Sequence, residues 1–223
     1  MSLFRNKLLD FNAPNRLKLG WMGRKSVVTY DAITGVVEDW AGASVLGMAN
    51  VSALNLGPAS GRRLLLKIPC PTCTSARDSR SHDNGNVYLS FRGDDAASSK
   101  YGVDNTINWL NTFENGTCRV NRKLRLMTNR VHVHYQRTSN VLTPAMSELW
   151  MTLGEDESYE IAGAAVAIHV CTINSEFDAM VAVGTDLEAA RALCNCYISP
   201  SNCSIPPPPP PSPPSPPPLP PSP

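Results

Sequence analysis

The stretch Asn86-Val87-Tyr88-Leu89-Ser90-Phe91-Arg92 alternates apolar side chains with more polar ones. Successive side chains of a β-strand point to opposite faces. The odd-numbered apolar residues of this stretch therefore share one face, while Tyr88 and Ser90 share the other. The pattern predicts a half-buried strand whose apolar face lies against a hydrophobic core.

Strand patterns recur along the chain. Residues 124–135 alternate in the same way, with Val131, Val133 and Tyr135 on one side. The longest apolar run, Ile161–Val170, predicts one buried strand, and the acidic residues before it predict a loop or hairpin tip. Many short strands separated by polar turns, with little helix, indicate a mainly β fold with a β-sandwich-like body. The other predicted strands are Ser26–Tyr30, Arg63–Ile68 (ending at Pro69), Leu149–Gly154, Tyr159–Thr172 and Ala179–Val183.

Two short helices are predicted, one towards each end of the chain. Near the N-terminus, Asn12 can cap the helix, Pro14 suits the first helical position, and Gly20 can take the left-handed turn that ends it. Near the C-terminus, Thr185 and Glu188 have the spacing of a capping box, and apolar residues follow at helical intervals. The fold class we expect is therefore mainly β with two short helices.

The C-terminal segment 200–223 has a different composition. Of the 18 residues 206–223, 14 are proline, against six in the rest of the chain. Such a segment cannot bury a core, so we expect a disordered polyproline II tail of roughly 55 Å if straight. Its proline and serine content is similar to that of hydroxyproline-rich glycoproteins of plant and algal cell walls. The alternatives are an unmodified spacer or a ligand for proline-binding domains.

Composition excludes several classes of function. The chain has 223 residues, of which 42% are hydrophobic, and a net charge of +1. This charge gives no reason to expect electrostatic capture by nucleic acid or by a membrane surface. No run approaches the roughly 18 apolar residues that a membrane-spanning helix needs. Residues 1–10 lack the apolar region of a signal peptide, which by itself would indicate a cytosolic protein.

Cysteines and glycosylation sequons favour an oxidising compartment. The odd number of cysteines leaves one unpaired or bonded elsewhere. Cys70-Pro71-Thr72-Cys73 also has zinc-knuckle or redox spacing, but it precedes a polar loop, and Cys194-Asn195-Cys196 is one residue short of a matching pair. We therefore favour disulfides. The candidates are Cys70, Cys73, Cys118, Cys171, Cys194, Cys196 and Cys203, and the N-glycosylation candidates are Asn50, Asn115 and Asn202.

Few residues are placed for catalysis or metal binding. On a strand, His132 and His134 would point to the same face and could supply two metal ligands. A third ligand would have to approach in the fold, from His82, His169, Asp83 or Asp94. Because catalytic zinc normally takes three protein ligands and water, we expect no metal here, but two strand histidines facing solvent or a polar core.

The acidic run Glu155-Asp156-Glu157, with Glu160 nearby, has carboxylates that could bind calcium. It lacks the Asp-x-Asp-x-Asp-Gly pattern of a calcium loop, so a solvated loop is favoured. The chain also lacks the Gly-x-Ser-x-Gly hydrolase elbow and a phosphate-binding loop. We expect no catalytic residues in this chain.

Four stretches, in this order, carry a resemblance to a known family. Phe11–Trp21 contains Asn-Ala-Pro followed by Leu-Gly-Trp, and Arg63–Pro69, Asn86–Arg92 and Arg130–Tyr135 come after it. Over roughly residues 8–185 the chain resembles gametolysin-type metallopeptidases, which are secreted, metzincin-like zinc enzymes of green-algal cell walls. The resemblance implies a peptidase whose zinc-bound water cleaves peptide bonds in wall glycoproteins.

The family's zinc motif, His-Glu-x-x-His with a third His, lies before the segment that Phe11–Trp21 matches. Only ten residues precede Phe11 here, and none is His. The resemblance therefore implies the downstream part of such an enzyme, inactive alone, with an incomplete N-terminus and zinc only in a full-length member. The expected domains are a catalytic-domain remnant at 1–25, a β-rich domain at 26–199 and the proline-rich tail at 200–223.

Two other interpretations stay open. The chain is either a non-enzymatic wall or matrix protein that binds glycoprotein or glycan, or an intracellular β domain with a proline spacer. The expected partners are cell-wall or matrix glycoproteins, without nucleic acid and without a membrane span.

Overall fold

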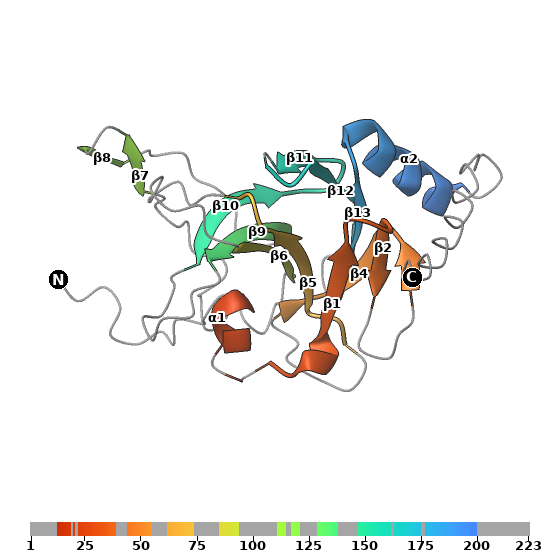
Figure 1. Cartoon of the computed structure of the whole chain (residues 1–223), viewed down its shortest axis with the longest axis horizontal. Coiled ribbons are helices and arrows are strands. Elements are labelled where there is room, and N and C mark those ends of the chain that lie inside the picture. Colours follow the sequence, from red (N-terminus) through yellow and green to blue (C-terminus); the bar gives the residue numbers. More distant parts are fainter. Residues whose placement is uncertain are drawn as a thin grey trace, which may run out of the picture.

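A computed structural model describes the backbone of residues 13–18, 20, 22–38, 44–54, 62–73, 85–93, 111–114, 117–120, 129–137, 147–161, 163–174 and 177–199. Within these ranges, the side chains of 13, 15, 18, 44, 45, 111–114, 117–120 and 137 are not described. The described chain is mainly β, as the sequence predicts, with two large sheets and a helix near the C-terminus (Figure 1).

The first sheet, sheet A, has seven strands, and the second, sheet B, has four. A separate hairpin is formed by β7 (Asn111–Glu114) and β8 (Thr117–Val120). In spatial order sheet A consists of β10 (Glu148–Leu153), β9 (Arg130–Arg137), β6 (Gly85–Arg92), β5 (Leu65–Cys70), β1 (Val27–Asp31), β2 (Val36–Glu38) and β3 (Ser44–Leu46). Sheet B consists of β11 (Ser158–Ile161), β12 (Val166–Asn174), β13 (Asp178–Gly184) and β4 (Met48–Ser52).

All neighbouring strands run antiparallel except β1 and β5, which pair in parallel from Val27↔Leu65 to Thr29↔Lys67. The strand that opened the sequence argument, β6, pairs along its full length with β9, from Gly85↔Arg137 to Arg92↔Arg130. It lies inside sheet A between β5 and β9. Both of its edges are therefore hydrogen-bonded.

The core lies between the inner faces of the two sheets. Alternate residues of both sheets are buried there, because each strand turns every second side chain inward. Sheet A contributes residues such as Ile68, Leu89 and Val133, and sheet B contributes residues such as Ile168 and Val181. The inner face of β6 consists of the three apolar residues that its alternation predicts.

Each sheet also carries a smaller apolar cluster on its outer face. Outside sheet A, Leu54, Leu65 and Tyr88 pack with Met22, and α1 (Ala13–Lys18) contacts β6. Outside sheet B, the 12-residue helix α2 (Leu187–Ile198) packs on β12 and β13. The two helices thus lie on opposite sides of the sandwich (Figure 1). A one-turn helix, η1 (Arg24–Ser26), precedes β1.

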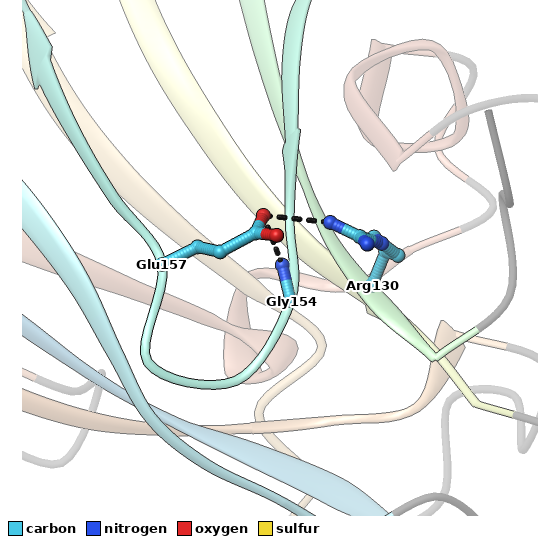
Figure 2. Close-up of polar contacts among 3 residues, drawn as sticks. All are labelled: Arg130, Gly154 and Glu157. Atoms are coloured by element: carbon cyan, nitrogen blue, oxygen red, sulfur yellow. Dashed lines mark hydrogen bonds and ion pairs between the residues drawn. The ribbon is translucent and has the colours of Figure 1, made fainter.

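The chain crosses from sheet A to sheet B between β3 and β4, and again at the turn between β10 and β11, which we call the crossover turn. The geometry of the crossover turn is held by Glu157, whose Oε2 accepts hydrogen bonds from Gly154 N at 2.8 Å and from Arg130 Nη1 at 2.6 Å. Arg130 begins β9, so one carboxylate ties the turn to the sheet that the chain has just left (Figure 2). On the other side, Asp156 N donates to Val170 O at 2.8 Å, which ties the same turn to β12.

Three strand predictions need correction. The strand Asn86–Arg92 is not half-buried: Tyr88 is 7% exposed and Ser90 1%, because the outer face of sheet A is covered as well. The run Ile161–Val170 is not one strand, nor is Tyr159–Thr172. A turn at residues 163–165 breaks both runs, with Gly163 (φ 90°) and Ala165 (φ 50°) in left-handed backbone conformations.

The strand predicted to end at Pro69 continues through it to Cys70. Proline lacks the N–H that a central strand needs. Here β1 pairs only with Leu65–Lys67, so beyond Lys67 that edge of β5 has no β1 partner. The missing N–H of Pro69 therefore interrupts no ladder with β1.

The helix predictions are confirmed, with changes at their starts. Helix α1 begins at Ala13, so Pro14 is its second residue, and Gly20 ends the turn with a φ of 74°. The predicted cap of the second helix, Thr185, is wrong: the N-cap is Asp186, whose Oδ1 accepts from Ala189 N at 2.8 Å. Both residues have capping side chains, but it is Asp186 whose carboxylate accepts from a backbone N–H of the first turn.

Gly85, at the start of β6, lies against the ring of Tyr135, and a Cβ added there would overlap the ring. Tyr135 also stacks on Trp150, with ring centroids 4.8 Å apart, and donates to Cys73 O at 3.0 Å. We expect Gly85→Ala to lower the free energy of unfolding by about 1–3 kcal/mol, a typical cost of overpacking. Urea denaturation with intact disulfides measures this. Gly23→Ala is the matched control, because nothing lies within 4 Å of its added Cβ; an equal effect of both variants contradicts the prediction.

We expect Glu157→Gln to lower the free energy of unfolding by about 0.5–1 kcal/mol at low salt. The variant loses the charge that pairs with Arg130 but keeps an acceptor for Gly154 N. The effect is small because half-exposed ion pairs contribute little to stability. Glu157→Ala should cost roughly 1 kcal/mol more, because it also removes that acceptor. Urea denaturation at low and high salt separates the two contributions, since only the charge effect is screened. Glu38→Gln, an exposed carboxylate at the end of β2, is the control. A loss for Glu157→Gln that does not shrink with salt would refute the ion-pair argument.

Candidate functional site

A group of polar side chains lies on the outer face of sheet B, where β11 and β12 form a hairpin. Ser158 and His169 are directly opposite each other in the register, and Ser158 Oγ lies 2.8 Å from His169 Nδ1. Asp156, in the turn just before β11, places Oδ1 3.5 Å from His169 Nε2. The imidazole is therefore held between a hydroxyl and a carboxylate.

The imidazole itself is buried, whereas the carboxylate is in solvent. The His169 side chain is 6% exposed and the Asp156 side chain 93%. Burial lowers the pKa of His169, Asp156 raises it, and the positive charge of Arg191 on α2 lowers it, with a net decrease from the ordinary value. A lowered pKa keeps the ring neutral at pH 7, so that one ring nitrogen is available as a proton acceptor.

The carboxylate decides which nitrogen that is. A negative oxygen beside Nε2 favours the tautomer that carries the proton on Nε2. His169 Nδ1 is then the acceptor, and the Ser158 hydroxyl donates to it. Such a serine–imidazole–carboxylate arrangement is chemically competent for nucleophilic catalysis, provided that a substrate can reach the hydroxyl.

A hollow of about 510 Å³ lies two residues further along the β11–β12 pair, where Glu160 is paired with Ala167; Ser158 and His169 are beside it and do not line it. The start of α2 contributes Thr185 and Asp186 to its wall. The remaining lining is apolar or small and consists of Ile161, Gly163, Ala165, Val166 and Ala167. The hollow therefore combines an apolar floor with two carboxylates and a hydroxyl.

The predicted histidine pair lies on the other side of the sandwich. His132 and His134 project from the outer face of sheet A, with ring centroids 6.0 Å apart, and are only 1% and 5% exposed. His134 Nδ1 is buried and has no hydrogen-bond partner among the residues that the structure describes. Burial, then the neighbouring His132, then Arg92 lower the pKa of His134 to about 3.

These two histidines do not gain a third ligand from the described residues. His169 lies on the outer face of sheet B. The hydrophobic core separates it from His132 and His134 on sheet A, so it cannot join them as a ligand. Among the described residues, no group of three His, Cys, Asp or Glu side chains converges as a metal site. The other proposed ligands, His82, Asp83 and Asp94, lie outside the described residues. The described part of the chain does not fit the zinc centre of a metallopeptidase.

The acidic run does not act as one cluster. Glu155 Oε2 accepts from Ile173 N at 3.0 Å, Asp156 faces His169, and Glu157 binds Arg130. Glu160 lies further along, on β11, at the hollow. Each carboxylate has a different neighbour, because the crossover turn directs these residues towards different elements.

Two disulfides join described cysteines. Cys70 is bonded to Cys73 and Cys171 to Cys194, with Cα atoms 5.3 Å and 5.4 Å apart. The Cys70–Cys73 turn also touches the β11–β12 turn, because the Thr72 hydroxyl donates to Gly163 O. Cys196 is disulfide-bonded as well, to a partner outside the described side chains. Of the other two candidates, the side chain of Cys118 and all of Cys203 lie outside the described residues.

Of the three glycosylation candidates, only Asn50 lies within the described residues. It is half-buried in β4, and its Nδ2 donates to Asp178 Oδ2 at 3.0 Å. The nitrogen that a glycan would modify is thus engaged in a hydrogen bond across the sheet. Asn115 and Asn202 lie outside the described residues and stay predictions.

Sequence reasoning missed the contact between Ser158 and His169. It placed Ser158 in an acidic loop and His169 at the end of an apolar strand. The available signal was Gly163: a turn centred there folds Ser158–Ile161 back on Val166–His169 and sets Ser158 opposite His169. Without that turn, the two residues would lie 11 positions apart along an extended chain.

Comparison of the chain with protein-family models, with curated proteins and with solved structures found no match. Function is therefore inferred from the residues themselves.

The low pKa of His134 predicts acid sensitivity. Its value of about 3 in the folded protein lies below the ordinary 6.5, so between these values the unfolded chain binds a proton that the folded protein does not. The free energy of unfolding should therefore fall by up to roughly 1.4 kcal/mol for each pH unit below about 6.5. Above pH 6.5 both states are neutral at this residue, and the contribution is flat.

The variant His134→Gln cannot titrate, so its unfolding free energy should fall less steeply between about pH 6 and pH 4. Denaturant titrations at several pH values measure the two slopes. His169→Gln is the comparison, because the pKa of His169 is lowered by a less complete burial. Parallel slopes for His134→Gln and the unmodified protein would show that folding does not lower the pKa of His134.

Proposed function

We propose that this chain is a disulfide-bonded β-sandwich module of a secreted cell-wall or extracellular-matrix protein, corresponding to the part of a gametolysin-like metalloendopeptidase that follows the zinc site. The observation that carries the proposal is the pair of disulfides, Cys70–Cys73 and Cys171–Cys194, in a domain followed by a proline-rich tail. Disulfides persist in oxidising compartments and are rare in the cytosol.

The order of the four stretches from Phe11–Trp21 to Arg130–Tyr135 supports the link to that family. Two of them, Asn86–Arg92 and Arg130–Tyr135, lie in paired core strands of sheet A. In this proposal the module is a scaffold: it would hold the catalytic part near wall glycoproteins, and the zinc-bound water of that other part would carry out peptide hydrolysis.

A second candidate function is a non-enzymatic module that binds matrix glycoprotein or glycan directly. It is favoured by the hollow at β11, β12 and α2, where Glu160, Thr185 and Asp186 offer acceptors for hydroxyl groups beside an apolar floor. Ligand sites commonly combine an apolar surface with a few polar groups of this kind.

In the described part of the chain, no helix is long and apolar enough to cross a bilayer.

We expect the protein in the medium and wall fractions of its source cells, with Cys70–Cys73 and Cys171–Cys194 detected by peptide mapping after alkylation without reductant. The purified chain should not cleave casein or wall glycoproteins, with or without added zinc, because the described residues do not converge on a metal site.

Cleavage that a chelator abolishes would contradict the scaffold role. Detection in the cytosolic fraction alone, with all seven cysteines alkylated, would contradict secretion and support an intracellular β domain with a proline spacer. Retention of the full chain on wall glycan, reduced by Glu160→Gln but not by the control Glu38→Gln, would favour the second candidate.

A further inference from the structure

We propose that Ser158 is the nucleophile of an ester-hydrolysing site on the outer face of sheet B, with His169 as its general base and Asp156 as the residue that positions the imidazole. The substrate class is a neutral carboxylic ester, such as an O-acyl group on a hydroxylated compound. This activity is independent of zinc and of the proposed function.

The contact between nucleophile and base meets the geometric requirement. The distance of 2.8 Å between Ser158 Oγ and His169 Nδ1 is a hydrogen bond of ordinary length for proton transfer. The two residues are fixed as a cross-strand pair, and the β11–β12 register is regular from Ser158↔His169 to Ile161↔Val166. Their relative position is therefore set by backbone hydrogen bonds rather than by a loop.

Asp156 completes the arrangement from the crossover turn. Its φ of 60° and the hydrogen bond from its N to Val170 O aim the carboxylate at His169 Nε2. In the well-known serine-protease triads the serine contacts Nε2 and the carboxylate contacts Nδ1. Here the roles of the two ring nitrogens are exchanged: Ser158 contacts Nδ1 and Asp156 contacts Nε2. At 3.5 Å and in solvent, the carboxylate acts on ring orientation and tautomer more than as a strong hydrogen-bond acceptor.

Arg191 supplies positive charge to the same site. It lies on α2 and acts electrostatically on His169 across the interface between the helix and sheet B. This charge makes protonation of His169 less favourable, which helps to keep the ring available as a proton acceptor. The site thus draws one residue from the turn, one from each strand of the hairpin and one from the helix.

The neighbouring hollow indicates the substrate class. Its floor of Ile161, Ala165 and Val166 can accept a small apolar group, and Glu160 with Thr185 can accept hydrogen bonds from hydroxyls. The carboxylates of Glu160 and Asp186 would repel an anionic ester. A neutral acyl ester of a hydroxylated alcohol is the class that fits both features.

The reaction proceeds in two balanced steps. The Ser158 proton passes to His169 Nδ1 as Oγ bonds to the acyl carbon, and the bond from that carbon to the alcohol oxygen breaks as the alcohol takes the proton from Nδ1. Water then attacks the acyl-serine, giving one proton to Nδ1, and the carboxylic acid leaves as Ser158 Oγ regains that proton. No oxidant, metal or other co-reactant is needed.

The test uses the full oxidised chain and a neutral alkyl fluorophosphonate, which bonds to activated serines with loss of fluoride. We expect one adduct per chain, mapped by peptide mass spectrometry to Ser158, and competition by p-nitrophenyl acetate. His169→Gln should slow labelling by roughly 100-fold or more, the usual contribution of a general base. Chelators should leave labelling unchanged, which separates this activity from any metallopeptidase contamination.

The matched control is Ser147→Ala, which removes a half-buried serine just before β10 and should label like the unmodified chain. Ser158→Ala should lose the adduct while keeping its circular dichroism spectrum. If that variant does not fold, the position of the adduct on the unmodified chain, mapped by peptide mass spectrometry, still tests whether Ser158 is the nucleophile. The absence of an adduct at Ser158, or equal labelling of Ser158→Ala, would overturn the proposal.

The variant Asp156→Asn tests whether Asp156 positions the His169 imidazole or only stabilises the fold. The groups that act on His169 are Asp156 from the crossover turn and Arg191 from α2. Loss of the Asp156 charge should lower the pKa of His169 further, so the pH at which labelling reaches half its maximum should move down. A purely structural role would change the thermal midpoint but leave this pH unchanged, and that result would remove Asp156 from the site.

Discussion

Burial of two sheet faces against each other is the constraint on which the rest of this structure depends. The strands of the two large sheets have between 3 and 9 residues, and a strand alone cannot satisfy its backbone or cover its apolar face. The inner residues of β6, β9, β12 and β13 meet in one cluster that excludes solvent. Because this core fixes which side chains point inward, it also fixes which ones point out.

The outward-facing residues carry the chemistry. On sheet A the same alternation that buries Val131 and Val133 places His132 and His134 on the outer face, where burial keeps His134 neutral. On sheet B it places His169 outward between two core residues, Ile168 and Val170. Both sites are therefore consequences of strand periodicity, and the core between them prevents their histidines from combining into one metal centre.

The crossover turn connects the fold to the candidate site. Glu157 joins the turn to Arg130 and Gly154 of the sheet A side, and this leaves the preceding residue, Asp156, facing His169. The carboxylates of Asp156 and Glu157 thus have different roles although the two residues are adjacent. One stabilises the connection between sheets, and the other orients an imidazole.

The sequence by itself determined the β class, the alternation of β6 and β9, the two helices and the chemical type of the proline tail, because these follow from local periodicity and composition. Only the tertiary structure decided that Ile161–Val170 folds back at Gly163, that Asp186 caps α2 and that Ser158 meets His169. The physical reason is that strand pairing is a contact between distant residues. Its register depends on where a turn falls, and a single glycine in an apolar run marks a candidate turn without deciding whether the chain folds back there.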